Sequence, residues 1–174
     1  MRRIRPVKRL PKRGFTLVEV LLAVAVLAFA ICGILATYLA CFNLTITSKN
    51  VNIATSAAQG VIEEIRNTPY SRMVDDHQIQ TGGVFYNLTL VSANLYRLNF
   101  TVNNLPQNMG VVYINQANPD LLTVTAAVCW KQGNTVIGED VNFNGVLDAG
   151  EDKNGNNLIS STVELVTQVI PRQL

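Results

Sequence analysis

An uncharged, strongly apolar stretch covers residues 20–42, in which Gly33, Thr37 and Tyr38 are the least apolar positions. A helix of these 23 residues is about 35 Å long at about 1.5 Å per residue, enough to cross a hydrocarbon core of about 30 Å. The pattern therefore predicts a transmembrane helix. A secretory signal peptide is the alternative, but its apolar region would be about 7 to 15 residues long and would end at a cleavage site of small residues.

The helical pattern continues beyond Asn43 with a polar face added. Apolar side chains recur at spacings of three and four, and polar side chains fall between them. Because Pro69 stops a helix, we expect one helix over residues 15–67, with residues 43–68 as its amphipathic continuation. Two helices broken near the β-branched cluster at residues 45–47 are the alternative. The positions that follow this period are Asn50, Ala54, Ala57, Ala58, Val61, Ile62 and Ile65.

Beyond residue 82 the pattern changes to that of β-strands. Five segments are rich in β-branched and aromatic side chains or alternate in polarity, and a polar turn separates the first two. Four or five antiparallel strands after one long helix predict an α+β fold, in which the helix packs on an antiparallel sheet within a globular head over residues 69–174. The candidate strands are residues 84–91, 95–102, 111–115 (the weakest), 121–131 and 160–170, with the hairpin turn at residues 92–94.

The charge is divided sharply between a short leader and the rest of the chain. The 174 residues carry a formal net charge of +2, and only 15% of them are charged. Residues 1–14 hold seven Lys and Arg side chains and no acid, whereas seven basic and twelve acidic side chains follow. The positive-inside rule places the leader in the cytoplasm and the head outside. An acidic head without a basic, aromatic-rich stripe argues against nucleic-acid binding.

Glu19 stands out because it lies at the edge of the apolar stretch. An ionised carboxylate is costly there unless a cation or a hydrogen-bond donor meets it. No Lys or Arg lies between Arg13 and Lys49. Cleavage between Gly14 and Phe15 would create an amine one helical turn before Glu19, able to neutralise it in the same chain or in a neighbour.

The run KRGFTLVEVLLAVAVLAF, which contains these residues, resembles the N-terminal signature of the type IV pilin and type II secretion pseudopilin superfamily. The resemblance implies that a prepilin peptidase in the bacterial inner membrane cuts after Gly14 and methylates the amine of Phe15. It also implies that Glu19 guides the subunit into a helical fibre of other pilins or pseudopilins, whose core is built from the apolar helices. Major pilins often carry a proline within this helix, whereas this chain has only Gly33 there.

A narrower similarity points to minor pilins of the PilV kind. It is carried by AAQGVIEEIRNTPY in the amphipathic part of the helix and by the strand that ends in Val128, Cys129 and Trp130. The order of one long helix followed by a β-meander also looks like a pilin head.

The run DVNFNGVLDAGE, residues 140–151, follows the spacing of an EF-hand calcium loop. Gly145 occupies the sixth position, where the turn is sharp, and Leu147 supplies the apolar eighth. Calcium prefers such hard oxygen donors, so we expect it to order this loop and to fasten the last two strands. The predicted ligands are the side chains of Asp140, Asn142, Asn144, Asp148 and Glu151, with the backbone carbonyl of Val146.

The loop pattern then starts again at Asp152, Asn154 and Asn156. Its twelfth position is Val163, so this second copy lacks its final acid. It is either a weak second calcium site or an extension that supplies ligands to the first. A polar turn that binds no metal is the alternative for both runs.

No catalytic constellation is visible in the sequence, and His77, the single histidine, is expected in a solvated loop. The chain therefore reads as a structural and assembly subunit, a minor pilin or pseudopilin with a calcium-stabilised head, and not as an enzyme. A calcium-dependent adhesin or DNA-uptake receptor displayed on the fibre is the alternative. The odd cysteine count excludes a disulfide scaffold, although a bridge between Cys41 and Cys129 is conceivable in an oxidising compartment.

Overall fold

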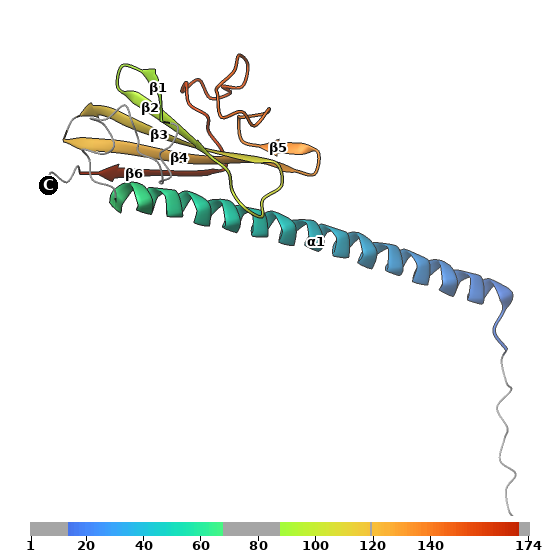
Figure 1. Cartoon of the computed structure of the whole chain (residues 1–174). Helices are drawn as coiled ribbons and strands as arrows, with labels where there is room; N and C mark the ends of the chain where they lie inside the picture. Colours follow the sequence, from blue (N-terminus) through green and yellow to red (C-terminus); the bar gives the residue numbers. More distant parts are fainter. Residues whose placement is uncertain (1–13, 68–87, 119, 171–174) are drawn as a thin grey trace, which may run out of the picture. The chain divides into compact units, whose positions relative to one another are not determined.

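The computed structural model describes residues 14–67, 88–118 and 120–170, and it confirms the predicted α+β fold of one long helix and an antiparallel sheet (Figure 1). The chain divides into two compact units, residues up to Thr45 and residues from Ile46 onward, and each is described by itself. The elements are α1 (Leu17–Asn67), β1 (Thr89–Ser92), β2 (Leu95–Phe100), β3 (Asn108–Asn118), β4 (Leu121–Gln132), β5 (Thr135–Ile137) and β6 (Val163–Val169).

The described residues of the first unit form an apolar helical segment that is exposed along its whole length. Phe15 and Thr16 precede α1, and the Thr16 hydroxyl accepts a hydrogen bond from the Glu19 N–H at 3.3 Å, so Thr16 is the N-cap. The helix is long and apolar enough to cross a membrane. It also continues without a break through residues 45–47, so the alternative of two helices is wrong.

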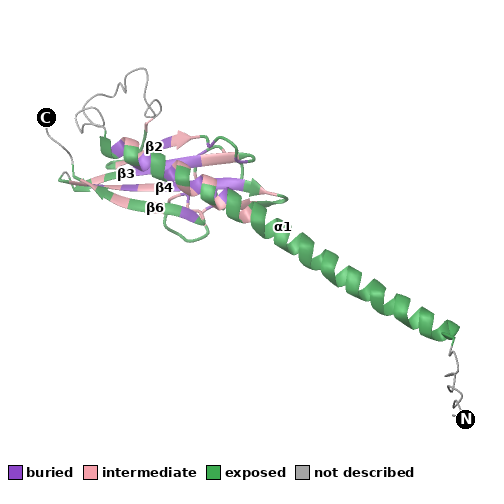
Figure 2. Cartoon of the chain, turned by 90° about the horizontal axis from the view of Figure 1, so that it is seen from below, coloured by how far each residue is buried: buried purple, intermediate pink, exposed green. Residues whose placement is uncertain are grey.

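In the second unit, one face of α1 packs on the sheet (Figure 2). This face is the predicted periodic stripe, the polar Asn50 included, except that Ala57 is only partly buried. The small alanines let the helix approach the strands closely, while the larger side chains fill the space between. The helix residues of this core are Ala54, Ala58, Val61, Ile62 and Ile65, and they meet Val112, Ile114, Val124, Ala126 and Trp130 of the sheet.

The sheet is antiparallel throughout, and β3 lies at its centre. The weak strand candidate at residues 111–115 is this central strand and is longer than predicted, since it covers Asn108–Asn118. Five consecutive residues, 110–114, are buried, because both faces of the sheet are covered. A strand buried on both faces loses the alternation of polar and apolar residues that marks a strand in sequence.

The first two strands match the expected hairpin in outline. Strand β1 is shorter than residues 84–91, of which residues 84–87 lie outside the described part, and Ser92 belongs to the strand rather than to the turn. The turn is Ala93 and Asn94, and β2 follows at Leu95.

Strands β5 and β6 pair with the same edge of β4. Ile137 of β5 lies opposite Trp130, and Val163 of β6 lies opposite Val128, so only Cys129 separates the two pairings along β4. Residues 138–162, which we call the double loop, therefore connect two strands that pair with neighbouring stretches of the same edge of β4. The short β5 was not predicted, and the last strand begins at Val163 instead of residue 160, because the preceding residues close the base of the double loop.

Candidate functional site

Two regions carry the predicted site residues, namely the start of α1 and the double loop. At the start of α1, Phe15 is 81% exposed and Gly14 lies just before it. A Cβ added to Gly14 would meet no atom within 4 Å, so the described structure of this chain gives no reason for a glycine there. A requirement for glycine at this position would then come from a partner molecule.

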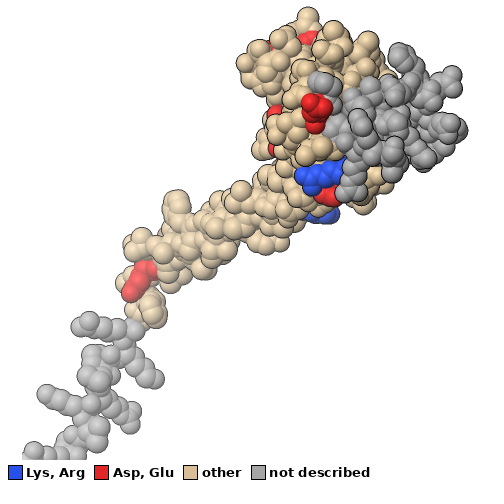
Figure 3. All heavy atoms as spheres, turned by 90° about the vertical axis from the view of Figure 1, so that its left-hand side faces the viewer, with Lys and Arg blue, Asp and Glu red and all other residues tan. Residues whose placement is uncertain are grey.

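Glu19 lies in the first turn of α1, where the helix dipole favours a carboxylate. It forms no ion pair with the described residues, among which Arg66 and Glu63 pair at 2.9 Å. The space-filling view shows one acidic side chain near the start of the apolar helix, and Glu19 is the only acid of residues 14–45 (Figure 3). The structure thus places Glu19 on an apolar surface close to the chain end that cleavage after Gly14 would create.

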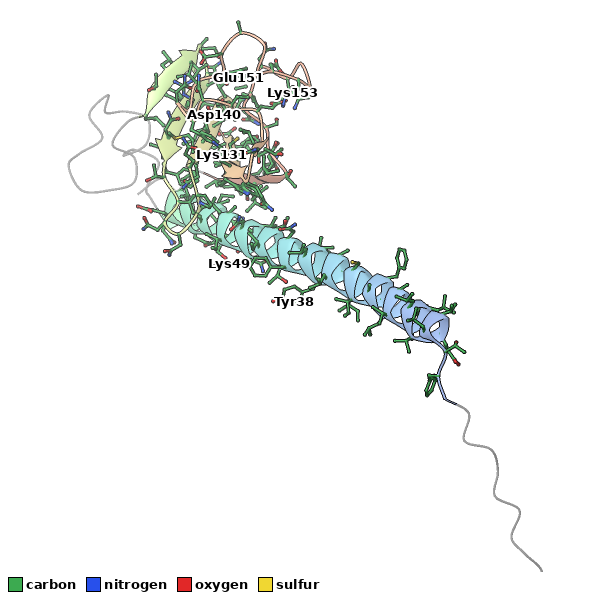
Figure 4. All side chains as sticks on the ribbon, turned by 90° about the vertical axis from the view of Figure 1, so that its right-hand side faces the viewer. Tyr38, Lys49, Lys131, Asp140, Glu151 and Lys153 are labelled. Atoms are coloured by element: carbon green, nitrogen blue, oxygen red, sulfur yellow. The ribbon has the colours of Figure 1, made fainter. Side chains whose placement is uncertain are left out.

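In the double loop, the first segment, residues 140–151, curls around the carboxylate of Asp140. This side chain is completely buried, and it accepts hydrogen bonds from the backbone N–H groups of Gly145 at 2.8 Å and Asn144 at 3.1 Å. Glu151, 7% exposed, closes the segment by accepting from the N–H groups of Val141 at 2.9 Å and Asp148 at 3.0 Å. Asp140 and Glu151 lie close together in the double loop (Figure 4).

The remaining predicted ligands of the first segment are also brought together. The amide groups of Asn142 and Asn144 donate to the same carboxylate oxygen of Asp148, at 2.7 and 2.8 Å. Gly145 has a φ of +70°, and a Cβ there would collide with the side chain of Asn99 from β2, so the sixth position requires glycine. Asn99 in turn donates to the carbonyl oxygen of Asn144 at 3.3 Å.

A second small core attaches the double loop to the sheet face opposite α1. Leu147, the predicted apolar eighth residue, packs there with Phe143, Leu158 and the fully buried Ile159. The strand residues of this core are Val111, Tyr113 and Cys129, with Leu95 and Met109 at its margin. The double loop is thus a packed layer over the sheet.

Burial raises the pKa of three acidic groups near this core. It raises the pKa of Asp140, against the lowering effect of its hydrogen bonds from Gly145 and Asn144, and the Glu151 carboxylate raises that pKa further. Burial likewise raises the pKa of the Cys129 thiol and of the Tyr113 hydroxyl. All three cysteines are free in the structure.

The oxygen atoms of the first segment fit the donor chemistry of calcium. Three carboxylates and two amide side chains surround one turn of chain, and no basic side chain forms a salt bridge with them among the described residues. In the described part of the chain, no three acidic, histidine or cysteine side chains converge as a metal cluster on their own. An ion here would therefore depend on the asparagine oxygens and a backbone carbonyl as well as on the acids.

Sequence reasoning missed Glu139, which is 6% exposed and accepts from the N–H groups of Lys153 at 3.0 Å and Ser160 at 2.9 Å. The second segment, residues 152–162, has no acid at its own end, yet it is closed by this carboxylate. The available signal was the repeated triplet Gly-Glu-Asp at residues 138–140 and 150–152. His77 lies outside the described residues.

The chain matches the family model of the prokaryotic N-terminal methylation motif over residues 9–35. This motif is the signature of the type IV pilin family, a family of structural and not enzymatic proteins. It implies processing by prepilin peptidase and assembly with other pilins. Comparison of the chain with curated proteins and with solved structures gave no match. The chain thus carries the N-terminus of a type IV pilin-like or pseudopilin precursor.

Proposed function

We propose that the protein is a minor pilin or pseudopilin, cleaved after Gly14, methylated at Phe15 and assembled into a type IV pilus or a type II secretion pseudopilus. The methylation motif, which runs directly into the exposed apolar first part of α1 with a single acid near its start, is the observation that carries this proposal. Before assembly, this helix anchors the subunit in the inner membrane, with the basic leader in the cytoplasm and the head outside.

Replacement of Gly14 by Ala tests the processing step. The added methyl group meets nothing in the chain, so a defect would arise at the peptidase. We expect Gly14→Ala to keep its leader in cells that contain the peptidase, as seen by intact mass and N-terminal sequencing. Gly33→Ala is the matched control, because its added Cβ also meets no atom within 4 Å. A mature Gly14→Ala protein, or a native protein that begins at Met1, would contradict the proposal.

We also propose that calcium binds the first segment of the double loop and stabilises the head. Asp140, Asn142, Asn144, Asp148 and Glu151 would supply side-chain oxygens and Val146 its carbonyl, while Asp152, Asn154 and Asn156 are candidate ligands of a second ion. The support is the burial of acidic side chains without a basic ion-pair partner among the described residues, an arrangement that a divalent cation would compensate.

An adhesin displayed on the fibre would use the same anchor and the same double loop. Adhesion of cells that is lost in loop variants while fibres still assemble would favour the adhesin. Equal loss of fibres and adhesion would favour a purely structural head.

A further inference from the structure

The double loop consists of two copies of one twelve-residue pattern, GEDVNFNGVLDA and GEDKNGNNLISS, which begin at Gly138 and Gly150. The backbone repeats with the sequence. Left-handed residues occur at the same three places in each copy, although two of the six are not glycine. They are Gly138, Phe143 and Gly145 in the first copy, with φ of 108°, 59° and 70°, and Gly150, Gly155 and Asn157 in the second, with φ of 89°, 73° and 59°.

The side-chain hydrogen bonds repeat as well. Asp140 accepts from the N–H of Gly145 at 2.8 Å, and Asp152 accepts from the N–H of Asn157, the matching residue, at 3.0 Å. The amide of Asn144 donates to Asp148 at 2.8 Å, and the amide of its counterpart Asn156 donates to Ser160 at 2.9 Å. The second segment is therefore folded like the first, although its final acid is missing.

Each segment is closed by a glutamate that precedes the other segment. Glu151 directly precedes the second segment, but its carboxylate binds the N–H groups of Val141 and Asp148 in the first. Glu139 directly precedes the first segment, but its carboxylate binds the N–H groups of Lys153 and Ser160, the matching residues in the second.

The two glutamates also form matching backbone hydrogen bonds, of which that of Glu139 joins the two segments. The N–H of Glu139 donates to the carbonyl oxygen of Ser160 at 2.9 Å, and the N–H of Glu151 donates to that of Asp148 at 3.1 Å. Glu139 thus ties the start of the first segment to the end of the second through both its backbone and its side chain.

We propose that the double loop orders as one interdependent unit, in which Glu139 is the positioning residue for the second segment as Glu151 is for the first. Loss of either carboxylate leaves two N–H donors without their acceptor, one near each end of a segment. Because Glu139 holds the two segments together, loosening of the second segment also releases the first. Insofar as the first segment binds calcium as proposed above, its affinity then depends on a carboxylate outside its own ligand set.

Hydrogen exchange of the full chain in detergent micelles, read by mass spectrometry in the two segments, tests this coupling. Glu139→Gln keeps the size of the side chain but replaces one acceptor oxygen with a donor. We expect exchange to become about tenfold faster in both segments, without calcium and with it. Glu151→Gln should do the same. Glu164→Gln, an identical change on the exposed face of β6, should leave both segments unchanged.

Hydrogen exchange of the unaltered chain also tests the coupling and does not depend on the folding of any variant. In the presence of chelator, the two segments should open with the same free energy, since neither can open alone. Different opening free energies, or an effect of Glu139→Gln confined to residues 152–162, would overturn the coupling. A failure of calcium to slow exchange in the unaltered chain would count against the proposed calcium site alone, because the coupling is measured without the ion.

Discussion

The hydroxyl oxygen of Tyr113 on the central strand β3 accepts a hydrogen bond from the buried backbone N–H of Ile159 at 3.1 Å. Ile159 is the eighth residue of the second segment and is itself fully buried against the sheet. The Tyr113 side chain, in the middle of the sheet, thus holds the double loop at Ile159, which also packs against the sheet. This contact joins the sheet to the part of the head that carries the candidate ligands.

Tyr113→Phe should therefore destabilise the head by about 1 to 3 kcal/mol, because it leaves the buried N–H of Ile159 without an acceptor. The transition can be followed through Trp130, the only tryptophan, which is 1% exposed in the core on the other side of the sheet. Tyr96→Phe, the same change on β2, is the matched control. Equal denaturant midpoints for Tyr113→Phe and the unaltered chain would show that the hydrogen bond contributes nothing to stability.

Removal of calcium should lower the melting temperature of the head, and the difference should vanish when Asp140 and Glu151 are both replaced by Ala. Under the calcium proposal the ion binds only the folded segment, so excess calcium would stabilise that state by mass action. Thermal unfolding with calcium and with chelator gives the two temperatures. Asp120→Ala and Glu164→Ala, which remove exposed acids, should retain the difference. Identical melting curves for the unaltered chain under both conditions would remove the calcium proposal.

Much of this architecture could be predicted from the order of apolar and polar residues. Helix α1 and strand β4 carry long, strongly patterned runs, and both were found within a few residues of their observed bounds. Strand β3 was underestimated because burial on both faces removes the alternation, and β5 is too short to show any period. Glu139 was missed for a different reason, since it contacts backbone groups that come to it only when the second segment folds back.

Alkaline pH should destabilise the head through Cys129 and Tyr113. Burial raises the pKa of both groups, so the folded chain keeps protons that the unfolded chain has already released. The free energy of unfolding should accordingly fall as the pH rises above about 8.5 through Cys129 and above about 10 through Tyr113, by at most about 1.4 kcal/mol per pH unit for each group.

Denaturant unfolding between pH 7 and pH 10 measures this slope, and Cys129→Ala should reduce it. Cys41→Ala, a change at an exposed position of the first unit, should leave the slope unaltered. A slope that is the same with and without the Cys129 thiol would show that other groups cause the alkaline instability.

Glu19→Gln should leave cleavage after Gly14 intact but reduce incorporation into the fibre. The variant keeps the size of the side chain and its place in the first turn of α1, while it removes the charge that the new amine of Phe15 would neutralise. Cell fractionation should show a protein of mature size that accumulates in the membrane and is depleted from sheared fibres, whereas Glu164→Gln should assemble normally. Assembly of Glu19→Gln at the level of the unaltered chain would show that pairing with the amine is not needed to recruit the subunit.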